Sequence, residues 1–92
     1  DFSKAELYTA GPLANFRFLI VVELAEPVQG EYYSLVDKNK EYSCEVLAEY
    51  PSRLYCSGPQ AAADDFVLFQ IFESTTDRVV FSGEVYCGLP LR

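Results

Sequence analysis

The sequence predicts an all-β fold in which about seven antiparallel strands form a two-sheet sandwich. Short runs of alternating apolar and polar residues recur along the chain, and turn-forming residues interrupt them every ~8–12 residues. No stretch of useful length has the helical period of about 3.6 residues. The 92 residues are 50% hydrophobic and include seven Tyr and seven Phe, which suits paired strands around one core. We therefore expect a single domain over residues 1–92.

The first part of the chain predicts an edge strand followed by a central strand. Residues 3–9 alternate weakly and end at a turn signal, Ala10-Gly11-Pro12. The strongest strand pattern is Asn15–Leu24, because every second residue from Phe16 onward is apolar and the opposite side is polar only at its ends. We expect the middle of this strand to be covered on both sides. A loop over residues 25–30 follows it.

The segment Tyr42–Cys56 predicts a hairpin closed by a disulfide. Two alternating runs flank a break at Tyr50-Pro51, and pairing across this break places Val46 opposite Leu54 and Cys44 opposite Cys56. Cysteines directly opposite each other on antiparallel strands are close enough to bond. We therefore expect a Cys44–Cys56 disulfide.

A second hairpin precedes it along the chain. Its strands are Glu31–Val36 and Glu41–Ala48, and the polar link 37–40 between them contains Asn39, which tolerates a left-handed conformation. A four-residue link places Tyr33 opposite Cys44 and Leu35 opposite Tyr42. Both hairpins then share one buried face, which carries the two cysteines.

The last part of the chain predicts a loop and a third hairpin. Residues 57–65 form the expected crossover between the sheets, and Phe66–Glu73 and Arg78–Cys87 form the hairpin. Two registers remain open, one with Ile71 and the other with Phe72 opposite Val79. The first groups Val67, Phe69 and Ile71 with Val79, Phe81 and Val85, whereas the second groups Phe66, Leu68 and Phe72 with Val79 and Phe81.

Composition argues against several classes of function. Fourteen acidic and seven basic residues give a net charge of −7, so nucleic acid and anionic membrane surfaces are unfavourable partners. The longest apolar run, Phe18–Val22, is far shorter than the ~20 residues of a membrane-spanning helix. The chain has no His, and its cysteines match no zinc-binding spacing. We expect no enzymatic activity, no cofactor, no metal site and no membrane insertion.

The three cysteines indicate the cellular compartment. They include no Cys-x-x-Cys motif, and in a small acidic chain they favour an oxidising environment. We therefore expect a protein that is secreted or on the cell surface. If Cys44 pairs with Cys56, Cys87 remains as a buried thiol or as a link to another chain. No leader segment is visible, so we expect a mature or excised piece of a longer protein.

Tyrosines between carboxylates mark the best candidate for a binding face. Tyrosine is rigid and amphipathic, which favours sugar or peptide contacts, but it is also a good strand residue that covers a sheet. Both roles remain open for the face expected on the outside of the central strands. Its candidate binding residues are Tyr32, Tyr55, Glu41, Glu45 and Glu49.

The strand and turn pattern resembles the immunoglobulin-like and fibronectin-like β-sandwich superfamily. More loosely, Cys44, Tyr50-Pro51, Arg53–Cys56 and Gly58-Pro59 are similar to a pattern in small modules of uncharacterised secreted bacterial proteins. The chain has no Trp and no Cys in its long second strand, so the inter-sheet disulfide of true immunoglobulin domains is not implied. The resemblance implies a sandwich topology and assigns no functional residue.

These features together predict a non-catalytic extracellular module for adhesion, surface display or protein docking within a larger secreted protein. One alternative is a carbohydrate-binding module that uses the Tyr and Glu face. Another is the subunit of an extracellular fibre, in which Cys87 or an exposed edge strand joins neighbouring copies. The sequence does not identify the protein or glycan partner.

Overall fold

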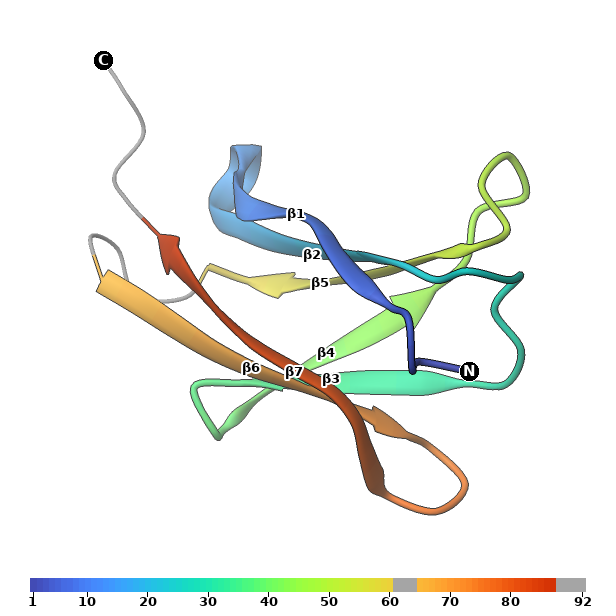
Figure 1. Cartoon of the computed structure of the whole chain (residues 1–92). Coiled ribbons are helices and arrows are strands. Elements are labelled where there is room, and N and C mark those ends of the chain that lie inside the picture. Colours follow the sequence, from blue (N-terminus) through green and yellow to red (C-terminus); the bar gives the residue numbers. More distant parts are fainter. Residues whose placement is uncertain (61–64, 88–92) are drawn as a thin grey trace.

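The computed structural model describes residues 1–60 and 65–87, and the strands in this part of the chain form one nearly closed, barrel-like sheet (Figure 1). All neighbouring strands are antiparallel, in the order β1-β2-β5-β4-β3-β6-β7. The prediction of an antiparallel all-β fold is confirmed. The elements are β1 (Glu6–Leu13), the 3-10 turn η1 (Ala14–Phe16), β2 (Arg17–Glu23), β3 (Tyr32–Val36), β4 (Lys40–Glu45), β5 (Arg53–Pro59), β6 (Asp65–Glu73) and β7 (Arg78–Cys87).

One continuous sheet takes the place of the two packed sheets that we expected, and no immunoglobulin-like arrangement is shown. Strand β5 pairs with both β2 and β4, and strand β3 pairs with both β4 and β6, so the sheet has no internal break. Turn signals identify strands that are neighbours along the chain. The β2–β5 and β3–β6 pairings join strands distant in sequence, and alternation gives no information about them.

Strands β1 and β7 form a seam where the sheet nearly closes on itself. They approach each other without backbone pairing, as the two edges of the sheet (Figure 1). Because every neighbouring pair is antiparallel and the sheet has seven strands, β1 and β7 run in the same direction. The inward-facing Phe81 and Val85 on β7 are only partly buried, in contrast to the buried residues on the strands opposite the seam.

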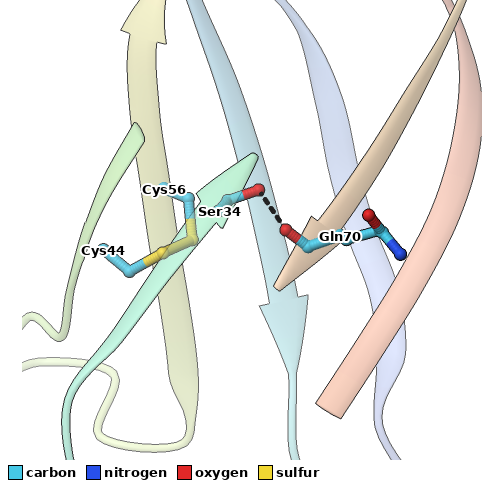
Figure 2. Close-up of a disulfide and its surroundings, with 4 residues drawn as sticks. All are labelled: Ser34, Cys44, Cys56 and Gln70. Carbon is cyan, nitrogen blue, oxygen red and sulfur yellow. Dashed lines mark hydrogen bonds between the residues drawn. A yellow bond between two sulfur atoms is a disulfide. The ribbon is translucent and has the colours of Figure 1, made fainter. Parts of the chain in front are cut away.

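The interior of the sheet is filled by apolar side chains. Its polar groups have partners: the Ser34 hydroxyl on β3 donates to the Gln70 carbonyl on β6 at 3.0 Å, and the Tyr42 hydroxyl donates to the Pro59 carbonyl. Figure 2 shows the first of these bonds beside the disulfide. The buried cluster contains Phe18, Ile20, Val22, Leu24, Val36, Tyr42, Leu54, Cys56, Val67, Phe69 and Ile71.

Strand β1 is the predicted edge strand, but it is longer than predicted. It continues through Gly11 and Pro12, where we expected a turn, because the outer side of an edge strand needs no backbone donor. The chain turns instead at Asn15 and Phe16, which have positive φ angles of 64° and 58°. On β2, Val21 points away from the core and is still buried, as expected for a strand covered on both sides.

The predicted register of the β3–β4 hairpin is wrong by one residue. Tyr33 lies opposite Ser43 and Leu35 lies opposite Glu41. The reason is the turn: Asp37 and Lys38 adopt left-handed conformations, and the Asn39 amide bonds the Val36 carbonyl at 3.3 Å, so three residues close the hairpin. Because side chains alternate, the slip turns Ser34 and Val36 inward and turns Tyr33 and Leu35 outward.

Of the two registers considered for the β6–β7 hairpin, the one with Phe72 opposite Val79 occurs, but only next to the turn, and the one with Ile71 opposite Val79 does not occur. Phe72 lies opposite Val79 near the turn, whereas Ile71 lies opposite Phe81. The irregularity between them leaves Val80 as an extra residue on β7. As a result, the inward face groups Val67, Phe69 and Ile71 with Phe81 and Val85, while Val79 points outward.

The Cys44–Cys56 disulfide is confirmed. The two cysteines are directly opposite each other on β4 and β5, with an S–S distance of 2.05 Å (Figure 2). The expected pair of Val46 and Leu54 does not form, because β4 ends at Glu45 and Val46 is exposed. Strand β5 also extends through Pro59, into the segment that we expected to be a loop.

Candidate functional site

The outer face of the central strands brings together part of the predicted binding set. Tyr55 on β5 lies directly opposite Glu45 on β4, and Glu41 lies on the same outward face of β4. Glu49 is exposed in the connection between β4 and β5 and belongs to neither strand. Three of the five predicted residues therefore share one face of the sheet.

Tyr32 does not belong to this face. It lies on the inward side of β3, where its ring packs against the core and meets the Phe2 ring edge-on at 5.1 Å. Its hydroxyl donates to the Gln29 carbonyl at 2.7 Å, and burial raises the pKa of Tyr32 above its ordinary value. These contacts give Tyr32 a structural role, and the one-residue slip in β3 explains why the sequence placed it outside.

Tyr33 takes the outward position instead. Its ring stacks on the Phe72 ring of β6, with centroids 5.1 Å apart and an angle of 7° between the planes. Its hydroxyl donates to Asp77 Oδ1 at 2.8 Å. This hydrogen bond is the main reason that the pKa of Tyr33 is raised, and the charges of Asp77 and Glu41 add to the shift. The phenol is therefore fixed in place on the surface.

An apolar strip continues from this stack across β3, β6 and β7. Leu68 and Val79 point outward and are 51% and 48% exposed. Phe66 on β6 and Tyr86 on β7 extend the strip, with their rings in an edge-on contact at 5.2 Å. We call this surface the outer strip, and its members are Tyr33, Leu35, Phe66, Leu68, Phe72, Val79 and Tyr86.

The outer strip contains a hollow of about 420 Å³. Its apolar lining residues are Leu35, Leu68 and Phe69. The β3–β4 turn bounds it, because the Asp37 amide bonds the Leu68 carbonyl at 2.9 Å and so holds this turn against β6. Small-molecule pockets have volumes of about 300–1,000 Å³, so the hollow is large enough for one side chain or a small group. Its polar lining residues are Lys38, Gln70, Ser82 and Glu84.

A second polar and aromatic cluster lies on the outer face near β1, β2 and β5. The Arg53 guanidinium lies between two tyrosine rings, 4.0 Å from the Tyr8 centroid and 4.5 Å from the Tyr50 centroid. Its Nε atom donates to Glu23 Oε1 at 2.7 Å, and the Ser52 hydroxyl donates to Glu23 Oε2 at 2.7 Å. These hydrogen bonds lower the pKa of Glu23.

This cluster around Arg53 holds several strands together. It joins the edge strand β1 to β2, β5 and the connection before β5 through one cation. Hydrogen bonds with Glu23 and Tyr55 raise the pKa of Arg53, so the charge is permanent. The sequence identified Tyr55 on this face, but Tyr8 and Glu23 were missed because they come from strands whose pairing was unknown.

No metal-binding group is found within residues 1–60 and 65–87: no three Asp, Glu or Cys side chains there are placed to hold an ion. No helix in the same part of the chain is long and apolar enough to cross a membrane. The side chain of Cys87 lies outside what the structure describes, so its predicted role as a buried thiol or an intermolecular link stays a prediction.

The sequence contained a signal for the outer strip that alternation alone did not resolve. Phe66, Leu68 and Phe72 are apolar on the side of β6 opposite to Val67, Phe69 and Ile71, so both faces of this strand are apolar. A strand covered on one side only is normally polar on the other. The apolar residues on the outward side of β6 therefore indicated a surface that is unfavourable to expose to water.

In comparisons with known proteins, no family model, no curated protein sequence and no solved structure matched the chain. The possible functions of the candidate surfaces are therefore inferred from the geometry of this structure alone.

Proposed function

We propose that this chain is a non-catalytic docking module that binds another protein through the outer strip. The observation that carries the proposal is the number of apolar side chains on the outward face of three neighbouring strands, which are half-buried on β3 and mostly exposed on β6 and β7. Contiguous exposed apolar surface on a folded domain is typical of interaction sites. The Tyr33–Phe72 stack supplies rigid aromatic area of the kind that is enriched in protein interfaces.

The disulfide supports an extracellular setting for this function. Cys44 and Cys56 are directly paired and bonded, and such bonds persist in oxidising compartments. A secreted or surface-exposed module that contributes adhesion or docking to a larger protein fits both the disulfide and the outer strip. This setting agrees with the acidic net charge of −7, which keeps a domain with exposed apolar residues soluble.

A carbohydrate-binding module is the second candidate, and a different surface favours it. Tyr8 and Tyr50 are 55% and 48% exposed on either side of Arg53, and Tyr55 lies opposite Glu45 nearby. Aromatic rings beside charged hydrogen-bonding groups are suited to sugar rings. The two candidates therefore use two separable parts of the outer face.

Parallel binding experiments with single-site variants test the two functions. The wild type, Leu68→Ser and Tyr50→Ala are compared on a glycan array and in capture of secreted proteins from the source cells. We expect protein capture that Leu68→Ser abolishes and Tyr50→Ala preserves. Glycan binding lost in Tyr50→Ala, with no protein capture dependent on Leu68, would establish the carbohydrate-binding function instead. Melting curves show whether each variant is folded.

A further inference from the structure

The hollow in the outer strip is bordered by carboxylates on two sides. Glu41 on β4 lies directly opposite Leu35, and Glu84 on β7 lies directly opposite Leu68. Both glutamates are exposed on the outward face. Each of the two leucines that line the hollow therefore has a negatively charged cross-strand neighbour.

Hydrogen-bonding groups lie beside the two leucines. One row across the sheet runs from Leu35 through Gln70 to Ser82. The backbone carbonyl of Gln70 is used by Ser34, but its amide group points away from that bond (Figure 2). The amide and the Ser82 hydroxyl each offer a donor and an acceptor, as a bound peptide backbone requires.

The charges around the hollow are mainly negative. Lys38 is the basic residue among its lining residues, whereas Glu84 lines it and Glu41 lies on the same face, directly opposite Leu35. The whole chain carries fourteen acidic and seven basic residues. A second copy of the chain, a nucleic acid or an anionic lipid surface would bring more negative charge toward these carboxylates.

We propose that the outer strip binds an extended, basic segment of a partner protein. One apolar side chain of that segment occupies the hollow against Leu35 and Leu68, and Lys or Arg residues beside it face Glu41 and Glu84. Complementary charge directs the encounter, and the apolar side chain provides most of the affinity. This inference rests on the docking function proposed above and specifies its partner.

Short synthetic peptides test this inference. The probe is a fluorescein-labelled peptide with a central Lys-Leu-Lys sequence between Gly and Ser residues, and its binding is measured by fluorescence anisotropy. The matched controls have Glu-Leu-Glu, Ser-Leu-Ser or Lys-Ser-Lys at the centre. We expect the Lys-Leu-Lys peptide to bind best and the control peptides to bind at least about tenfold more weakly. Added salt weakens this binding, since the charges are exposed.

Variants of the protein locate the site. Glu41→Gln and Glu84→Gln each lower the affinity for the Lys-Leu-Lys peptide by about two- to fivefold, as expected for exposed charge pairs. Leu68→Ser lowers it by about tenfold or more. Glu26→Gln is the matched control, because this exposed glutamate lines a separate hollow with Asp1 and Lys4. We expect Glu26→Gln to bind the Lys-Leu-Lys peptide with the affinity of the wild type.

The outcomes separate the inference from the docking function. If the Glu-Leu-Glu or Ser-Leu-Ser peptide binds as well as the Lys-Leu-Lys peptide and Leu68→Ser abolishes that binding, the strip docks proteins but its partner is not basic. If no peptide binds in a way that depends on Leu68, both the basic partner and the docking function are overturned.

Discussion

The backbone of Gly58 lies against the ring of Tyr42 inside the sheet. A Cβ atom added at Gly58 would collide with three carbon atoms of that ring, which is fully buried and held by its hydroxyl bond to the Pro59 carbonyl. The largest residue of the core therefore depends on the absence of a side chain on the neighbouring strand. This pair is a sensitive point of the fold.

Gly58→Ala is expected to destabilise the protein by about 1–3 kcal/mol, because the Tyr42 ring must move within a close-packed core. For a domain of this size, this corresponds to a fall in melting temperature of more than about 4 °C. Gly11→Ala on β1 is the control, since a Cβ atom there meets nothing within 4 Å. Thermal unfolding followed by circular dichroism measures both. Equal melting temperatures for the two variants would contradict the proposed packing.

The Arg53–Glu23 pair predicts a dependence of stability on pH. Hydrogen bonds from Arg53 and Ser52 hold the pKa of Glu23 below its ordinary value of 4.5 in the folded protein. The pair therefore stabilises the fold fully above pH 4.5, and this contribution is lost as the pH falls through the lowered pKa. We expect Glu23→Gln to melt below the wild type at neutral pH and to lose that difference in acid.

Melting temperatures of the wild type, Glu23→Gln and Glu26→Gln between about pH 7 and about pH 3 check this expectation. Glu26 is exposed in the connection after β2, so its variant controls for the loss of one negative charge. A difference between the wild type and Glu23→Gln that stays constant across this range would show that the ion pair does not contribute.

The Tyr33–Asp77 hydrogen bond predicts an alkaline transition. The folded protein holds the pKa of Tyr33 above its ordinary value of 10.0, mainly because the phenol donates to Asp77. The bond therefore stabilises the fold below pH 10.0, and this stabilisation is lost as the pH rises through the raised pKa. Phenolate absorbance of the wild type minus that of Tyr33→Phe isolates this titration. We expect Asp77→Asn to shift its midpoint down.

Two outcomes of the difference titration would contradict this prediction. A Tyr33 midpoint at or below 10.0 would mean that the phenol is not held by Asp77 in solution. A midpoint that stays raised in Asp77→Asn would assign the shift to burial and to Glu41 instead.

The Cys44–Cys56 disulfide predicts a stability that depends on redox conditions. Its cysteines are 12 positions apart, and closing a loop of this length in the unfolded chain stabilises the fold by about 3 kcal/mol. Reduction should therefore lower the melting temperature by more than about 10 °C. Measurements in a Cys87→Ser background exclude thiol exchange with the third cysteine. Cys44→Ala with Cys56→Ala is the control and should not respond to the reductant.

The disulfide was predictable from the sequence because the two cysteines are at matching positions on either side of a proline break. The register of β3 and β4 was not, because it depends on where the turn begins. Lys rarely adopts a left-handed conformation, so the sequence did not indicate one at Lys38 and favoured Asn39 instead. One residue of error in the turn was enough to exchange the two faces of β3.

The candidate site was likewise predicted only in part from the sequence. The sequence placed Tyr55, Glu41 and Glu45 on one outer face, and the structure agrees. It chose Tyr32 over Tyr33 because of the slipped register. The hollow depends on β3, β6 and β7 lying side by side, and β3 meets β6 through a pairing of residues far apart in the chain. Such a pairing is fixed by the assembled core, and local patterns do not encode it.

The parallel arrangement of β1 and β7 at the seam limits how the chain can be rearranged by engineering. Antiparallel neighbours can be joined by a two-residue turn, but parallel neighbours require a crossover of about a dozen residues or more. A circular permutant opened at the β3–β4 turn would need such a crossover to connect β7 to β1. With a short linker, one of these two edge strands would have to leave the sheet, and the interior beside Phe81 and Val85 would be exposed to water.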